Sequence, residues 1–74
     1  MNVTINLYAV LREGRFESAK RTLPERTTIA DIMSVLNLSR RTGIVVLLNA
    51  KLAEEDVELK EGDALSFFPL VGGG

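Results

Sequence analysis

Three consecutive glycines, Gly72, Gly73 and Gly74, end the chain and directly follow the apolar residues 67–71. Glycine has no side chain and wide access to backbone conformations, so this ending cannot pack into a core but can pass along a narrow channel. Four extended residues reach at most about 14 Å. The C-terminal carboxylate of Gly74 is therefore a candidate reactive group for another protein's active site. The residues before it would dock the body of the protein on that partner; they are Phe68, Pro69, Leu70 and Val71.

A glycine ending also has plainer explanations. Chain ends are often disordered, and short glycine segments are also left behind by artificial linkers. The tail by itself favours neither these explanations nor a working carboxylate, so the rest of the sequence must distinguish between them.

The composition excludes several kinds of site. The chain has 74 residues, a formal net charge of −1, no cysteine and no histidine. This length predicts one small domain. Without cysteine there is no disulfide, no thiolate metal site and no side-chain persulfide, and without histidine the commonest general base is missing. We find no nucleophile–base pair and no metal-ligand cluster, so the sequence predicts no metal, no bound cofactor and no enzymatic activity of its own.

Charge and hydropathy limit the partners. Acidic and basic residues are interspersed and nearly balanced, which gives no reason to expect nucleic acid or an anionic membrane as the main partner. No apolar run approaches the roughly 20 residues that span a bilayer, and the first residues lack the features of a signal peptide. The sequence therefore predicts a cytoplasmic protein.

The first third of the chain predicts two strands. Residues 2–7 alternate strictly, with Val3, Ile5 and Leu7 on one face, as in a half-buried strand. Residues 8–13 indicate a turn of helix or an irregular connection. Residues 16–23 alternate more weakly and carry several charges, which predicts a strand paired with the first near a sheet edge, and Pro24 would stop it.

A helix should follow. Ile29, Ile32, Met33 and Leu36 recur at the spacing of one buried helix face. Thr28 precedes them and is a favourable N-cap, and Asp31 three residues later completes a short form of the capping box. The pattern fades near residue 37.

Three more strands are expected. Residues 44–48 form a continuous apolar run, residues 51–53 suit a short strand, and residues 64–68 suit a last strand that Pro69 ends. The order predicts an α+β fold in which a mixed sheet, with the helix crossing to a parallel strand, packs on one main helix. We expect the first and last strands at its centre, residues 1–71 as one domain and residues 72–74 as a flexible tail.

Adjacent aromatic residues in the last strand must face opposite sides. We assign Phe67 to the core together with Leu65, and Phe68 to the other face as an exposed anchor for a partner. The alternative is that Phe68 is one of the single exposed apolar residues that are normal on protein surfaces.

Three segments resemble one known family. The segment Leu7-Tyr8-Ala9-Val10-Leu11-Arg12-Glu13-Gly14 resembles the F-A-x-L-R-E segment of MoaD/ThiS-type sulfur carriers, above all the small subunit of molybdopterin synthase. The segment Asn49-Ala50-Lys51-Leu52, with residues 59–63 (LKEGD) after it, is similar to the family's N-G-x-x and L-x-x-G-D stretch. Residues 64–73 (ALSFFPLVGG) are similar to its V-x-F-F-P-P-V-x-G-G ending. The resemblance extends over nearly the whole chain.

This resemblance implies a ubiquitin-like β-grasp fold and a carrier role. In such a carrier, an E1-like adenylyltransferase uses ATP to adenylate the C-terminal glycine, and a sulfur donor converts it to a thiocarboxylate. The thiocarboxylate then enters the large subunit of molybdopterin synthase and donates sulfur to a pterin precursor. By this resemblance Gly74 would be the reactive residue, with Gly72 and Gly73 as the tail behind it.

Two departures from the family pattern affect the tail. Three glycines stand where the usual ending has two, which shifts its reach by about 3.5 Å. Leu70 also replaces the second proline, which leaves the backbone less restricted.

Other functions remain open. The same activated glycine could be joined to a lysine, as in a ubiquitin-like protein modifier, or the acceptor could be the thiazole precursor of thiamine. A third possibility is a β-grasp binding module with an inert tail, in which deletion of Gly73 and Gly74 would change nothing.

Overall fold

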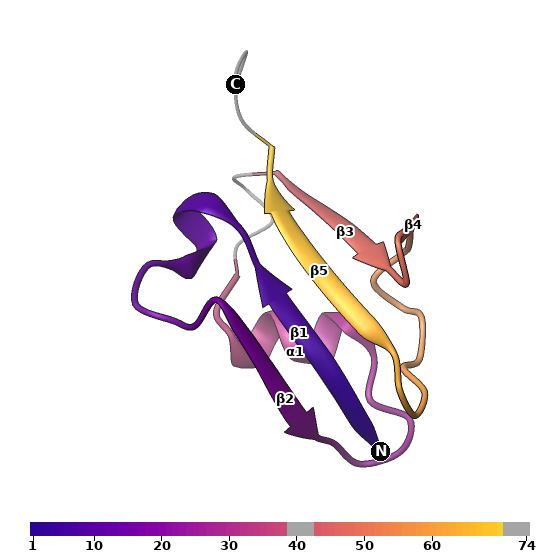
Figure 1. The fold of residues 1–74 in the computed structure, drawn as a ribbon. Coiled ribbons are helices and arrows are strands. Elements are labelled where there is room, and N and C mark those ends of the chain that lie inside the picture. Colours follow the sequence, from indigo (N-terminus) through magenta and orange to yellow (C-terminus); the bar gives the residue numbers. More distant parts are fainter. Residues whose placement is uncertain (39–42, 71–74) are drawn as a thin grey trace.

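The computed structural model describes residues 1–38 and 43–70, so the predicted tail, residues 72–74, lies outside this part together with residue 71. Within the described ranges, five strands and one α-helix are arranged in two layers (Figure 1). The elements in chain order are β1 (Asn2–Leu7), the 3-10 helix η1 (Ala9–Arg12), β2 (Ser18–Thr22), α1 (Ile29–Val35), β3 (Ile44–Leu48), β4 (Lys51–Leu52) and β5 (Ala64–Pro69).

The strands form one mixed sheet in the order β2-β1-β5-β3-β4. The first and last strands are neighbours near its centre, as predicted, and they run parallel. The helix crosses from β2 to β3, and these two strands run in the same direction, because β2 is antiparallel to β1 and β3 is antiparallel to β5. The expected helical crossover between parallel strands is therefore confirmed. Adjacent parallel strands, here β1 and β5, must be joined by a long crossover connection. All the elements between β1 and β5 form that connection.

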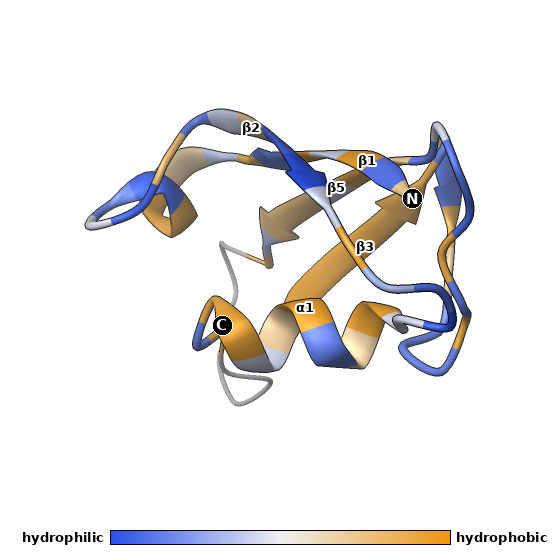
Figure 2. Ribbon diagram, turned by 90° about the horizontal axis from the view of Figure 1, so that it is seen from below, coloured by the Kyte–Doolittle hydropathy of each residue, from blue (hydrophilic) through white to orange (hydrophobic). Residues whose placement is uncertain are grey.

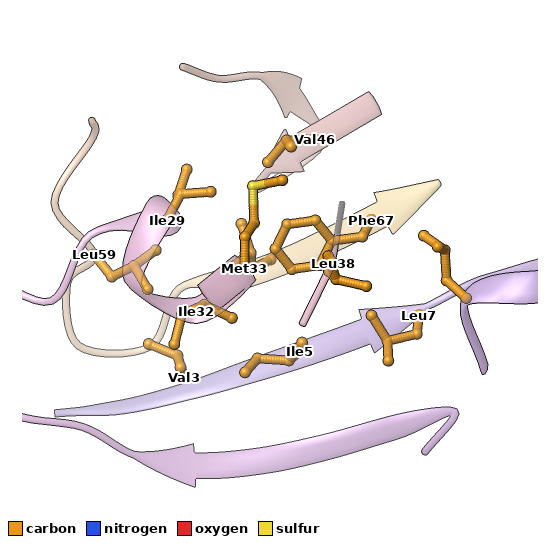
Figure 3. Close-up of a cluster of buried hydrophobic side chains, with 12 residues drawn as sticks. Val3, Ile5, Leu7, Ile29, Ile32, Met33, Leu38, Val46, Leu59 and Phe67 are labelled. Carbon is orange, nitrogen blue, oxygen red and sulfur yellow. The ribbon is translucent and has the colours of Figure 1, made fainter. Parts of the chain in front are cut away.

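The core lies between one face of the sheet and α1 (Figure 3). Strict alternation places Val3, Ile5 and Leu7 of β1 on this face, beside Leu65 and Phe67 of β5. Phe67, Leu65 and Leu7 are completely buried, which confirms the predicted core side of β5. The other buried apolar residues are Leu11, Ile29, Ile32, Met33, Leu38, Val46 and Leu59.

The helix begins as its capping residues predict. The side chain of Thr28 accepts a hydrogen bond from the backbone of Asp31 at 3.2 Å, and the backbone of Thr28 donates to the carboxylate of Asp31 at 2.9 Å. This reciprocal capping box satisfies two backbone donors of the first turn. The backbone N–H groups of Ile29 and Ala30 donate to carbonyls of the loop that follows β4.

The helix ends at Val35, with Leu36 as its C-cap. Asn37 adopts a positive φ of 58°, and the N–H of Leu38 donates to the carbonyl of Met33 at 2.9 Å, as in a Schellman-type end. The guanidinium of Arg15 adds a second cap from outside the helix. Its Nε donates to the carbonyl of Leu36 at 2.8 Å and its Nη2 to that of Asn37 at 3.2 Å.

Three strands, β2, β4 and β5, have boundaries that differ from the prediction. The short strand β4 ends at Leu52 rather than at residue 53, and β2 ends at Thr22, one residue earlier than predicted. The edge strand β2 begins at Ser18 rather than at residue 16, because Phe16 lies outside the ladder with the guanidinium of Arg21 over its ring at 4.9 Å. The last strand includes Pro69, which pairs with Ile44. As its final residue, Pro69 fits a place where a missing N–H costs little.

The connection between β3 and β4 carries backbone strain. Asn49 and Ala50 have positive φ angles of 52° and 70°, the requirement of a type I′ hairpin turn, which favours glycine at its second position. We expect Ala50→Gly to raise the free energy of unfolding by about 0.5–1 kcal/mol and the melting temperature by about 3–6 °C.

Thermal unfolding followed by circular dichroism measures this effect. Gly62→Ala is the matched control, because Gly62 has a φ of 83° and an added methyl group would meet no atom within 4 Å. This variant should lose about 1 kcal/mol through backbone strain alone. A lower melting temperature for Ala50→Gly would contradict the strain at Ala50.

Candidate functional site

The parallel pairing of β1 and β5 brings their carboxyl ends to the same end of the sheet (Figure 1). Leu7 pairs with Phe67, and the N–H of Tyr8 donates to the carbonyl of Phe67 at 3.2 Å. Leu70, the residue after β5, therefore leaves the sheet beside η1. The predicted tail residues 72–74, and Val71 of the predicted docking surface, lie outside the described residues.

Phe68 is half-buried rather than exposed, which corrects the sequence-based prediction. Its ring stacks on the ring of Tyr8, with centroids 4.1 Å apart and planes 9° apart. Tyr8 lies 60 positions earlier in the sequence, so the sequence pattern of β5 alone could not reveal this contact. The stacked rings lie on the open face of the sheet, which is the face opposite α1. They are beside the point where the chain leaves β5.

Arg12 supports the same stack from η1. Its guanidinium carbon lies 5.5 Å from the centroid of the Tyr8 ring, within the range of a cation–π contact. Its Nε donates to the carbonyl of Leu7 at 2.8 Å, and its Nη2 lies 3.7 Å from Glu17. The Arg12 side chain thus joins the end of β1 to the aromatic pair and leaves part of its charge facing solvent.

Gly43 fixes the position of Leu70, a role that the sequence analysis did not identify. The N–H of Leu70 donates to the carbonyl of Gly43 at 3.0 Å. A methyl group added at Gly43 would lie 3.2 Å from two carbon atoms of the Leu70 side chain, and Gly43 also has a φ of 72°. In the sequence, Gly43 was only an isolated glycine before an apolar strand. That pattern does not indicate which residue the glycine contacts.

An apolar patch continues from the stack across the open face. Val45 pairs with Phe68, Leu47 pairs with Ser66, and Leu52 of β4 pairs with Leu47. Leu52 is 79% exposed and Leu70 is 63% exposed. We define the open-face patch by the residues Tyr8, Val45, Leu47, Leu52 and Phe68.

The other half of the open face is polar and internally hydrogen-bonded. Asn6 accepts a hydrogen bond from Ser18 at 2.8 Å, and Asn2 accepts one from Thr22 at 2.9 Å. Coloured by hydropathy, β2 is a mixture of pale and blue segments, whereas β3 is orange (Figure 2). The open face therefore has one apolar side, next to the exit of the chain from β5, and apolar surface of this kind suits a partner protein.

Truncation of Phe68 should affect both binding and folding. Because Phe68 is stacked and half-buried, we expect Phe68→Ala to lower the free energy of unfolding by about 1–2 kcal/mol, besides weakening the partner complex. A double-mutant cycle with Tyr8→Ala should give a coupling of about 0.5–1.5 kcal/mol. Urea unfolding of the four proteins measures it, and additive losses would contradict the stacking geometry.

The described residues contain neither a metal-binding cluster nor a membrane-spanning helix. Within residues 1–38 and 43–70, no group of three Asp or Glu side chains lies close enough to hold a metal ion. In the same ranges, no helix has the length and hydropathy needed to cross a membrane.

The arrangement of one helix on a mixed sheet with parallel first and last strands defines a ubiquitin-like β-grasp protein, as the resemblance implied. The sequence model of the ThiS family matches residues 5–74. The chain belongs to the ThiS family and is a sulfur carrier of the MoaD/ThiS type. A search of curated protein sequences gives no match.

Solved structures share this fold over the whole chain. SAMP1 from Haloferax volcanii is 26% identical, with a TM-score of 0.77 and full coverage of both chains. The thiamine biosynthesis protein ThiS from Geobacter metallireducens is also 26% identical, with a TM-score of 0.67 and full coverage of both chains. A chain in the complex of subunits 1 and 2 of molybdopterin-converting factor from Helicobacter pylori 26695 is 21% identical, with a TM-score of 0.66 and full coverage of both chains.

Proposed function

We propose that this protein carries sulfur as a thiocarboxylate on Gly74 and donates it as the small subunit of a molybdopterin synthase. The carboxylate of Gly74 attacks the α-phosphate of ATP on an E1-like adenylyltransferase, which forms the acyl-adenylate and releases pyrophosphate. A sulfur donor then attacks the acyl carbon and displaces AMP. Where the donor is a persulfide, the product is an acyl disulfide, and a thiol reductant cleaves its S–S bond so that one sulfur remains on the chain as the thiocarboxylate.

One observation carries the proposal: the family match runs from β1 through the last glycine. The chemistry is consistent with the composition, because adenylation supplies the leaving group and the partner supplies the catalytic residues. A carrier of this kind needs no cysteine or histidine of its own, and the chain has neither.

The described residues have two tasks in this mechanism. The open-face patch provides apolar area for docking, next to the exit of the chain from β5. Gly43 holds the backbone of Leu70 and so sets the direction in which the chain departs. Positioning matters here, because a misplacement of about 1 Å can cost a hundredfold in rate.

The choice of acceptor rests on the ending Phe67-Phe68-Pro69 and on the fold shared with the molybdopterin-converting factor chain from Helicobacter pylori. That structure holds two different subunits together. By analogy, the partner of this chain would be a large synthase subunit.

Intact-mass measurement after reconstitution tests the carrier role. The full chain is incubated with ATP, a sulfur donor and the adenylating enzyme of its host. We expect a mass increase equal to one oxygen-to-sulfur exchange, located in the C-terminal peptide. An unmodified chain under conditions that activate a known carrier would favour the inert-tail module instead.

A second experiment assigns the acceptor. The thiocarboxylated chain is offered, in separate reactions, a pterin precursor with a large synthase subunit and a thiazole precursor with thiazole synthase. Sulfur transfer only in the first reaction supports our proposal, and transfer only in the second supports a thiazole carrier. Lysine adducts on host proteins would support a protein modifier, the alternative that similarity to SAMP1 favours.

A further inference from the structure

The outer edge of β2 presents unpaired backbone groups. The carbonyl of Glu17 and the N–H of Leu23 bond to the β1 side. Backbone groups alternate in direction along a strand, so those of Ser18, Lys20 and Thr22 point away from the sheet. No backbone group in the described part of the chain bonds to them. Such an edge is a template for a further strand.

A hollow adjoins this edge on the helix side of the sheet. Phe16, Arg21, Val35 and Leu36 are among the residues that line it. Val35 is 82% exposed although it belongs to α1, so its side chain is available to a partner. Arg15 joins the two walls of the hollow, because its Nη1 donates to the carbonyl of Leu11 at 3.1 Å while its Nε bonds the end of α1.

We propose that this edge and hollow, together called the β2 groove, bind an extended peptide segment that alternates apolar and acidic residues. Added as a strand to β2, such a segment would form backbone hydrogen bonds to Ser18, Lys20 and Thr22. Its apolar side chains would face Phe16 and Val35 in the hollow, and its acidic side chains would lie on the open face next to Lys20.

Charge favours this occupant over a second copy of the chain. Lys20 and Arg21 are adjacent in the middle of the edge strand, so antiparallel pairing of two β2 strands would bring like charges together. An acidic segment would be attracted to the same positions. Glu17, the neighbouring acidic residue, is already paired with Arg12 at 3.7 Å, and Glu13 lines the hollow together with two arginines.

The β2 groove is separate from the proposed docking surface. The strand β2 lies at one edge of the sheet, whereas β3 and β4 of the open-face patch lie at the other. Both surfaces could therefore be occupied together, and this inference does not depend on the sulfur-carrier role. Peptide binding at the β2 groove would recruit this chain to proteins other than its activating enzyme and acceptor.

Nuclear magnetic resonance titration of the full chain tests the proposal. The probe is the synthetic peptide acetyl-Ser-Val-Glu-Ile-Asp-Val-Glu-Ser-amide. A peptide of the same composition, with its acidic and apolar residues in separate blocks, is the control. We expect amide shifts confined to residues 14–22 and 34–37, and slower hydrogen exchange at the amides of Ser18, Lys20 and Thr22, with the alternating peptide only.

Two substitutions of Lys20 distinguish the contribution of the backbone N–H at the β2 edge from that of the side-chain charge. Lys20→Pro removes an outward N–H without breaking the β1 ladder and should abolish binding. Lys20→Ala keeps the N–H and should weaken binding by about threefold to tenfold. Circular dichroism checks that both variants fold, and Val35→Ser provides a change in the hollow that leaves β2 intact and should also weaken binding.

Several outcomes would overturn the proposal. These are an absence of shifts at millimolar peptide, shifts centred on the open-face patch, or equal binding of the block peptide. Peptide-independent dimerisation in analytical ultracentrifugation that Lys20→Pro abolishes would show that a second copy, not an acidic peptide, occupies the edge.

Discussion

Gly73→Val is expected to reduce thiocarboxylate formation by about a hundredfold or more while leaving the fold intact. A side chain next to the terminal residue would obstruct a channel built for glycine, and the carboxylate would miss the position at which it meets ATP. The change lies outside the packed domain, whose buried residues all come from positions 3–67 in the described part of the chain. The melting temperature should therefore stay within error of the unsubstituted protein.

Single-turnover mass spectrometry with the adenylating enzyme measures the rate of this step. Gly62→Ala is the matched control, because it strains the backbone in a remote turn and should lower stability without slowing activation. Gly74→Val should behave as Gly73→Val does. Normal thiocarboxylate formation in both tail variants would rule out the proposed role of the glycine ending.

Phe67→Ala is expected to lower the free energy of unfolding by about 3–5 kcal/mol. Phe67 has no exposed surface, lies in the central strand β5 and pairs with residues on both sides. A chain of this length has a total stability of roughly 4–11 kcal/mol, taking about 0.05–0.15 kcal/mol per residue. The variant should therefore be marginally stable or partly unfolded at room temperature.

Urea unfolding compares this variant with Phe68→Ala, which removes the same side chain one position later. The half-buried Phe68 loses less apolar contact, so its truncation should cost less than half as much free energy. Equal losses at the two positions would contradict the assignment of Phe67 to the core and Phe68 to the open face. Phe67→Leu, which keeps most of the buried volume, should restore part of the stability.

The family resemblance could be recognised from the sequence alone, because the three matching segments occur in the order that the family has. What it could not give was the acceptor, since SAMP1 and the thiamine biosynthesis protein ThiS both share the fold of this chain at 26% identity. The acceptor depends on the shape of a partner's active site, which leaves no pattern in this chain.

Several local features of the fold followed directly from the sequence. The alternation in residues 2–7 predicted β1 and its buried face, and the spacing of Ile29, Ile32 and Met33 predicted the buried face of α1. Thr28 and Asp31 predicted where the helix begins. These features depend on residues a few positions apart, whose geometry is set by the period of a strand or a helix.

Only the tertiary structure decided the arrangement around the exit from β5 and along the β2 edge. The stacking of Tyr8 on Phe68, the contact of Gly43 with Leu70 and the cap that Arg15 places on α1 all join residues more than twenty positions apart. Phe68 was assigned to the correct face, but its burial depended on which strand β5 would join. Periodicity fixes the face on which a side chain lies, whereas the neighbour that covers it is set by strand order and by the packing of the whole domain.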